Sequence, residues 1–195
     1  MANANRLSGL APVRYMSSAP WSGGGNIYSI DSAYATALYP GDPVASSGAS
    51  DSYGIQGVVL GVAGAAIRGV ILAIGINPQG GPYINPNNLT LVSAPAVKTQ
   101  NYYALVVDDP SVIFEIQEVG TALVAADCGL NANFSFGAAG TLSGVGILNS
   151  TKAGTATLNM KLLGLSQRAD NIFGTNAKWN VLINNHELST GTAGV

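Results

Sequence analysis

The sequence predicts an all-β protein, a sandwich or barrel of roughly ten short strands. Short runs rich in β-branched and aromatic residues recur along the chain, separated by Gly, Pro, Asn and Asp. No amphipathic segment is long enough for a three-turn helix, although residues 32–38 and 170–178 could each hold a single turn. We find no internal repeat and expect one all-β domain over residues 26–195, preceded by an extended arm over residues 1–25.

The first 25 residues are predicted to form this arm because two prolines interrupt any helix and a Ser-Gly-Gly-Gly run forms a flexible joint. Arg14, Tyr15 and Trp21 give the arm side chains of the types that dominate interface energies. The sequence leaves open the alternative that the segment packs against its own domain.

The strands from residue 26 onward are predicted by their β-branched and aromatic content. They cover residues 26–29, 58–62, 68–76, 89–93, 102–108, 112–119, 134–137, 144–148, 155–165 and 179–183. Residues 39–43, Tyr-Pro-Gly-Asp-Pro, form a dense turn, and residues 46–54 are predicted to be a polar loop tip. Residues 77–88 form a long loop punctuated by proline, of the kind that often carries function.

Residues 55–76 have the length and small-residue content of a membrane-spanning helix. Arg68 lies near the middle of this segment, where a charge costs roughly 2.5–3.5 kcal/mol. The glycines and β-branched residues favour strands over helix. We therefore predict two short buried strands here and no membrane partner.

The composition favours a protein that works inside an assembly. Of 195 residues, 47% are apolar and only 9% are charged, and the net charge is −2. Soluble domains typically carry about 25% charged residues, whereas the buried centres of interfaces are depleted in charge. The eight Lys and Arg residues are scattered, so no basic stripe for nucleic acid is expected.

The densest group of carboxylates consists of Asp108, Asp109, Glu115 and Glu118. Such a group could bind Ca²⁺ or act as an acid–base pair. We favour an architectural role, because Asp108-Asp109-Pro110 has the composition of a turn and no second acidic cluster accompanies it. Alternation then places Glu115 on one face of the strand and Glu118 on the other, with the apolar residues.

No enzyme signature, cofactor site or metal site is predicted. Cys128 is the only cysteine and His186 the only histidine. We expect Cys128 to be a small buried residue and His186 an ordinary surface or interface residue. The sequence contains no Gly-X-Ser-X-Gly nucleophile elbow and no dinucleotide-binding fingerprint.

Charged residues surround an apolar stretch near the C-terminal end. Lys161, Arg168, Asp170 and Lys178 flank this stretch and Trp179. An edge with Arg and aromatic residues could anchor the chain on a partner. It could equally be a core strand with solvated neighbours.

Three stretches carry a resemblance to a known family: residues 1–16 (MANANRLSGLAPVRYM), residues 102–118 with Asp-Asp-Pro, and residues 162–174 (LLGLSQRADNIFG), continued by Ala-Lys-Trp at 177–179 and Ile-Asn-Asn-His at 183–186. They resemble the capsid decoration or cement proteins of tailed bacteriophages. The resemblance covers most of the chain and is weakest at residues 46–54 and 134–154.

The resemblance implies a jelly-roll-like β protein on the outer surface of an icosahedral head in the virion, made in the host cytoplasm. It would reinforce contacts between subunits of the major capsid protein as a homo-oligomer, a dimer or a trimer. A head fibre, tail or baseplate component is the first alternative, and a carbohydrate-binding β-sandwich the second. The family has no active-site motif to transfer, so the interface candidates rest on residue chemistry: Arg14, Tyr15, Trp21, Tyr83, Arg168 and Trp179.

Overall fold

The structure is a computed structural model that describes residues 3–76, 93–136, 146–189 and 191. These residues form eleven strands and one short 3-10 helix, η1 (Ala125–Asp127), so the predicted all-β class is confirmed. Tyr83, the loop at residues 77–88 and nearly all of the strand predicted at residues 89–93 lie outside the described residues.

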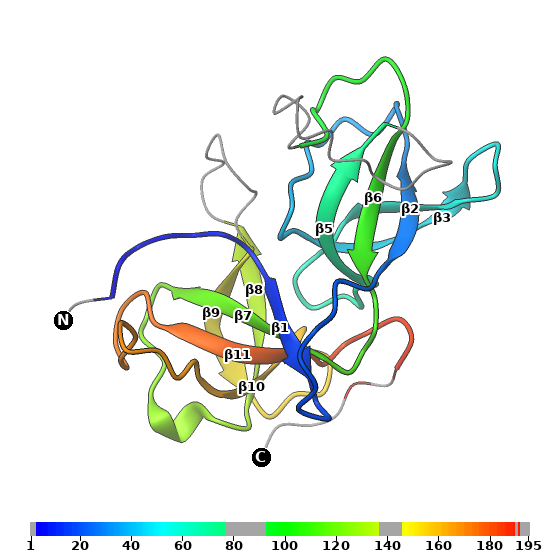
Figure 1. The fold of residues 1–195 in the computed structure, drawn as a ribbon. Helices are drawn as coiled ribbons and strands as arrows, with labels where there is room; N and C mark the ends of the chain where they lie inside the picture. The colour runs from blue at the N-terminus through cyan, green and yellow to red at the C-terminus, as the bar shows by residue number, and fades with distance from the viewer. Residues whose placement is uncertain (1–2, 77–92, 137–145, 190, 192–195) are drawn as a thin grey trace.

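Five strands close into a barrel, which we call the first barrel (Figure 1). Around the barrel the order is β2-β4-β3-β5-β6, with β2 and β4 parallel and the other pairs antiparallel. The strands are β2 (Asn26–Ile30), β3 (Pro43–Ser50), β4 (Gln56–Leu60), β5 (Gly69–Gly75) and β6 (Tyr102–Val107).

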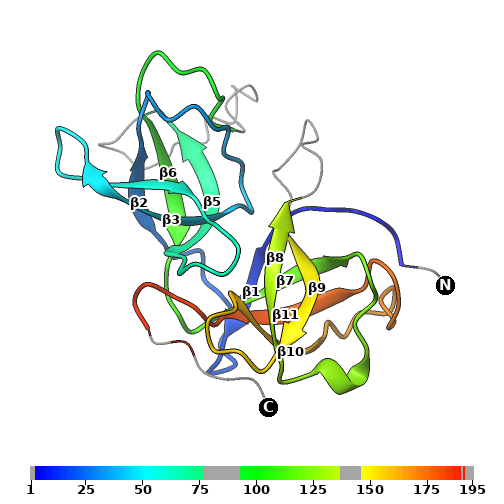
Figure 2. The ribbon, with the colours of Figure 1, turned by 180° about the vertical axis from the view of Figure 1, so that it is seen from behind.

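The other six strands form the second sheet, which lies beside the first barrel in both views (Figures 1 and 2). Its order is β1-β7-β11-β10-β8-β9, and a parallel pairing of β9 with β7 closes the sheet on itself. The strands are β1 (Ala11–Tyr15), β7 (Val112–Val119), β8 (Asn131–Phe136), β9 (Gly146–Ala153), β10 (Met160–Leu165) and β11 (Lys178–Ile183). The jelly-roll arrangement is not confirmed, because these strands do not form two four-stranded sheets.

Strand β5 lies between two hydrophobic cores. Val70 belongs to the core of the second sheet, whereas Ile71 and Ile74 belong to the core of the first barrel. Because both faces of β5 are covered, its sequence is a continuous apolar run rather than an alternating one. The two strands predicted within residues 55–76 are therefore confirmed as β4 and β5, and no helix in the described part of the chain is long and apolar enough to cross a membrane.

Strand β7 follows the predicted alternation. Phe114 and Ile116 are buried in the core of the second sheet, and Glu118 on the same side is 1% exposed. Glu115 faces the other way and is partly exposed. Gln117 shares the face of Glu115 but is buried, because the N-terminal segment covers it.

The segment predicted as an arm contributes a strand. β1 pairs antiparallel with β7, with Ala11 opposite Glu115 and Tyr15 opposite Val112. Leu10, just before β1, is 2% exposed and belongs to the core of the second sheet. Within the described residues, the N-terminal segment therefore packs against its own sheet, which is the alternative that the sequence left open.

Strand β3 was not predicted, since part of it lies in the segment taken as a polar loop tip. Its first residues, Pro43 and Val44, are buried, but Ser47–Ser50 are small and exposed. Such residues have low β propensity, and the strand is held by backbone pairing with β4. The hairpin of these two strands projects from the first barrel (Figure 1).

Candidate functional site

The interface candidates occupy different environments. Arg168 is exposed in the loop between β10 and β11, which we call the β10–β11 loop. Arg14 and Tyr15 lie on β1 and are partly exposed. Trp21 is partly buried against the core of the second sheet. Arg168 is therefore the exposed member of the described candidates.

Trp179 is 0% exposed and lies inside the core of the second sheet, so its prediction as an interface residue is corrected. Trp179, Val181 and Ile183 are alternate residues of β11, and all three lie on the face of the strand that packs into the core. Its ring meets Phe173 edge to face, with centroids 5.7 Å apart. Phe173 is 45% exposed and its neighbour Ile172 is 51% exposed. The buried indole thus supports an exposed aromatic side chain that the sequence did not single out.

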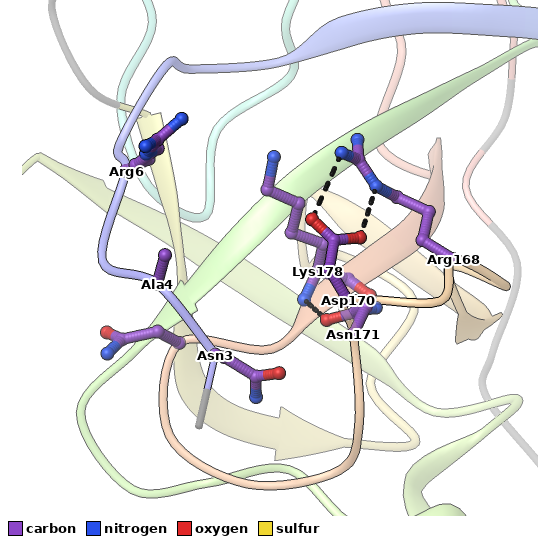
Figure 3. A pocket seen from close by; sticks show the side chains of 8 residues that line it. Asn3, Ala4, Arg6, Arg168, Asp170, Asn171 and Lys178 are labelled. Atoms are coloured by element: carbon purple, nitrogen blue, oxygen red, sulfur yellow. Dashed lines mark hydrogen bonds and ion pairs between the residues drawn. The ribbon is translucent and has the colours of Figure 1, made fainter. Parts of the chain in front are cut away.

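Arg168 lines a surface hollow of about 220 Å³, which we call the Arg168 hollow (Figure 3). The N-terminal segment forms one side of it, with Arg6 and Asn3, and the β10–β11 loop and the start of β11 form the other. Its lining residues are Asn3, Ala4, Arg6, Arg168, Asp170, Asn171, Asn176 and Lys178.

Gln117 fixes the N-terminal wall of the hollow. Its Oε1 accepts a hydrogen bond from the backbone amide of Arg6 at 2.8 Å. Its Nε2 donates to the Oδ1 of Asn5 at 2.8 Å and to the Oδ1 of Asn176 at 3.4 Å. Because Gln117 is 3% exposed, these bonds are shielded from water and hold the segment firmly.

Asn3 joins the N-terminal segment to the β10–β11 loop. Its Nδ2 donates to the carbonyls of Ile172 at 2.8 Å and Thr175 at 3.1 Å. Its Oδ1 accepts from the amide of Ile172 at 3.0 Å. The side-chain amide thus pairs with backbone groups as a neighbouring strand would.

Asn171 holds the same loop from within. Its Nδ2 donates to the carbonyls of Ser166 and Lys178, both at 2.8 Å, and its Oδ1 accepts from the amide of Lys178 at 2.8 Å. Asn171 is buried, so its amide is satisfied by the loop rather than by water. The loop has a defined shape without regular secondary structure.

The charges of the hollow are mostly paired. The Nε of Arg168 lies 3.1 Å from the Oδ1 of Asp170, and its Nη1 lies 3.2 Å from the Oε1 of Glu115. The Nζ of Lys178 lies 3.5 Å from the same Glu115 oxygen. The hydrogen bond to Asp170 raises the pKa of Arg168, and the same bond lowers the pKa of Asp170. Two cations therefore face two carboxylates.

Arg6 is the additional cation of the hollow. Its side chain is exposed, and its guanidinium makes no hydrogen bond or ion pair within the described residues. Figure 3 shows it on the wall opposite Arg168 and Lys178. Sequence reasoning missed Arg6 and Asn3, because their position beside residues 166–178 follows from the pairing of β1 with β7 rather than from a local pattern.

The carboxylates of the predicted group lie in different environments, and two of them, Asp109 and Glu118, accept hydrogen bonds from nearby backbone amides. Asp109 caps its own turn: its Oδ1 accepts from the amide of Ser111 at 2.8 Å and from the Ser111 hydroxyl at 2.6 Å. Glu118 is buried, which raises its pKa, and its Oε2 accepts from the amide of Leu123 at 2.8 Å. Within the described residues, no group of three or more His, Cys, Asp or Glu side chains is placed to hold a metal ion.

Asp108 belongs to a buried polar cluster between the first barrel and the second sheet. The hydroxyl of Tyr28 donates to its Oδ2 at 2.6 Å and accepts from the Nε of Arg68 at 2.7 Å. The Nη1 of Arg68 lies 3.8 Å from the Oε2 of Glu187, whose carboxylate accepts from the amide and hydroxyl of Ser46. The cluster ties the segment after β11 to the first barrel.

His186 and Cys128 differ from their predicted environments. His186 is 2% exposed rather than on the surface, and burial lowers its pKa. Its Nδ1 accepts from the amide of Leu188 at 3.0 Å. Cys128 is exposed rather than buried, since the turn after η1 lies at the surface.

A second hollow, of about 240 Å³, lies on the first barrel and bears on the carbohydrate alternative. It contains Asp31, Tyr34 and Asp51. The Oδ1 of Asp51 accepts from the amides of Tyr53 and Ile55 at 2.9 Å, and its Oδ2 accepts from the hydroxyl of Tyr103 at 2.8 Å. Because these bonds shape the loop itself, Asp51 has little capacity left for a ligand.

The Arg168 hollow, with Ile172 and Phe173 beside it, is therefore the surface that combines a fixed shape, free donors and exposed apolar side chains. Comparison of the chain with protein-family models, curated proteins and solved structures finds no match in any of the three.

Proposed function

We propose that this chain is a structural virion protein, a capsid decoration or cement protein. It binds the outer surface of an icosahedral phage head and stabilises contacts between subunits of the major capsid protein. It acts as a homo-oligomer, a dimer or a trimer, and has no catalytic role.

The observation that carries the proposal is the meeting of the stretches that resemble cement proteins. The stretch at residues 1–16 supplies Asn3 and Arg6 to the Arg168 hollow. The stretch at residues 102–118 supplies Glu115, which pairs with Arg168 and Lys178 from the third stretch and its continuation. Segments far apart in the sequence thus build one surface, which supports a shared binding role for them.

The chemistry of this surface suits contact with another protein. Arginine and aromatic side chains dominate the energy of many interfaces. Phe173 is exposed but held against Trp179, so little conformational entropy is lost when a partner covers it. Weak contacts suffice on a shell, because an oligomer engages several sites at once. A protein that binds the expanded shell more tightly than the unexpanded one stabilises it by mass action.

The test is sedimentation of purified protein with expanded, undecorated heads of the phage concerned. We expect the protein to co-sediment saturably and to raise the temperature at which the heads break open. Absence of co-sedimentation at saturating protein, or binding without any gain in heat resistance, contradicts the proposal.

A variant locates the binding surface. Phe173→Ala should weaken head binding about tenfold, as expected for the loss of an aromatic anchor. Tyr53→Ala is the matched control, because Tyr53 is 64% exposed on the β3–β4 hairpin. Equal affinity of the two variants for heads would place the interface elsewhere.

A further inference from the structure

We infer that the Arg168 hollow recognises a single carboxylate side chain, Asp or Glu, on the surface of a partner protein. The identity of that partner rests on the proposed function, but the chemistry of the hollow can be tested on the isolated protein. The hollow leaves hydrogen-bond donors free within the described residues.

The free donors belong to its three cations. The Arg6 guanidinium has all its N–H groups free within the described residues. Arg168 pairs through some of its guanidinium N–H groups with Asp170 and Glu115, and the Lys178 ammonium group pairs with Glu115. The hollow therefore keeps charged donors, those of Arg6 above all, that have no acceptor within the described residues.

The net charge of the hollow favours a ligand that carries one negative charge. Arg6, Arg168, Lys178 and Asp170 line the hollow, and Glu115 pairs with Arg168 and Lys178 behind it, so three cations and two carboxylates leave a surplus of one positive charge. A carboxylate carries one negative charge and accepts two parallel hydrogen bonds from a guanidinium. A phosphate monoester carries nearly two negative charges and would leave the hollow with a net negative charge.

The size and rigidity of the hollow fit such a ligand. Its volume is about 220 Å³, enough for a carboxylate with the methylene groups behind it and for bridging water. Asn3, Asn171 and Gln117 fix both walls by hydrogen bonds to backbone groups. The donors are thus positioned before the ligand arrives, which lowers the entropic cost of binding. The exposed Ile172 and Phe173 would contact the apolar surface around the partner's acidic residue.

The first experiment uses the isolated full-length protein and NMR of the arginine Nε–H and asparagine side-chain amide groups. The probes are N-acetyl-glutamate amide, its neutral counterpart N-acetyl-glutamine amide, and inorganic phosphate. We expect saturable shifts around the hollow with the glutamate probe, with a dissociation constant in the millimolar range. The Arg6→Gln variant should weaken this binding at least about fivefold. Arg14→Gln is the matched control and should leave binding unchanged, since Arg14 lies on β1 outside the hollow.

Three results would overturn the inference: equal shifts with the neutral probe, tighter binding of phosphate than of the glutamate probe, or unchanged binding by Arg6→Gln.

The second experiment repeats head binding with the Arg6→Gln variant. This variant should lower the apparent affinity for heads at least about fivefold relative to the parent protein and reduce its dependence on salt. If the parent protein does not bind heads but binds the glutamate probe through Arg6, the proposed function fails and the carboxylate site stands. If the parent protein binds heads and Arg6→Gln binds them equally well, the carboxylate site fails and the proposed function stands.

Discussion

At the scale of single residues, Asp42 is an ionisable side chain buried away from water. Asp42, in the turn before β3, is 2% exposed, and its Oδ2 accepts from the amide of Tyr39 at 2.9 Å. Its Oδ1 has no hydrogen-bond partner within the described residues. Burial raises the pKa of this carboxyl to about 7, against the opposing effect of the Tyr39 hydrogen bond.

The Asp42 pKa predicts how stability depends on pH. The folded-state pKa lies above the ordinary value, so the folded chain binds a proton that the unfolded chain has lost. The stabilising effect of this proton is complete below the unfolded-state pKa and disappears as the pH rises through 7. The Asn side chain of Asp42→Asn cannot ionise. From about pH 5 to about pH 8 the unfolding free energy of the parent should therefore fall by about 2 kcal/mol relative to that of the variant. Urea denaturation at the two pH values measures this; a difference independent of pH contradicts it.

Gly41 lies against the backbone of the N-terminal segment. It has a φ of +92°, and an added Cβ would lie 2.6 Å from the carbonyl oxygen of Ser8. Gly41→Ala should therefore cost about 2–4 kcal/mol of unfolding free energy, from backbone strain together with this overlap. Gly48→Ala is the control, because Gly48 has a φ of +78° but nothing within 4 Å of an added Cβ. Equal costs in urea denaturation would show that the overlap is relieved without penalty.

At the scale of elements, alternation predicted the strands whose two faces differ. β7 and β11 each place apolar side chains inward at every second residue, and their predicted limits are correct to within one residue. The same alternation could have assigned Trp179 to the core, since it shares its parity with Val181 and Ile183. β3 could not be predicted in this way, because its outer half is small, polar and exposed.

The candidate site was predictable only in part. Arg168 stood out because charged residues surround an apolar stretch there, and the structure places it at the surface hollow. Arg6 and Asn3 reach the hollow through the pairing of β1 with β7, two strands about a hundred residues apart in the sequence, and no local pattern encodes that pairing. Phe173 lies at the surface, where its ring packs against the buried ring of Trp179.

Two truncations separate the hollow from the sheet. Deleting residues 2–6 removes Asn3 and Arg6 but keeps β1, so we expect an intact β fold with weakened head binding. Deleting residues 2–22 also removes β1 and Leu10, which is buried in the core of the second sheet. That loss should lower the unfolding free energy by at least about 3 kcal/mol. Denaturation followed by circular dichroism measures both; equal stability of the two truncations would show that β1 is dispensable.

At the scale of the whole molecule, the first barrel contributes residues to the core of the second sheet. Ile67 and Val70 come from the barrel side of the chain but belong to the core of the second sheet. The backbone of Ile67 also pairs with the segment at His186, and Arg68 joins the buried cluster with Asp108 and Glu187. Neither part can open without exposing groups of the other.

This coupling predicts a single cooperative unfolding transition. Trp179 lies in the core of the second sheet and Trp21, the other tryptophan, packs against that core, so their fluorescence follows this part of the molecule. Far-ultraviolet circular dichroism follows the strands of both parts. The two signals should give coincident curves in urea. A fluorescence transition clearly separated from the circular dichroism transition would contradict the coupling.

The central claim is that the chain decorates a phage head through the surface around Arg168 and Phe173. Electron cryo-microscopy of expanded heads saturated with the protein tests this claim most directly. We predict density for the first barrel and the second sheet on the outside of the shell, with the Arg168 hollow and Phe173 facing the major capsid protein. Heads without added density, or decorated heads in which this surface faces solvent, would contradict the account.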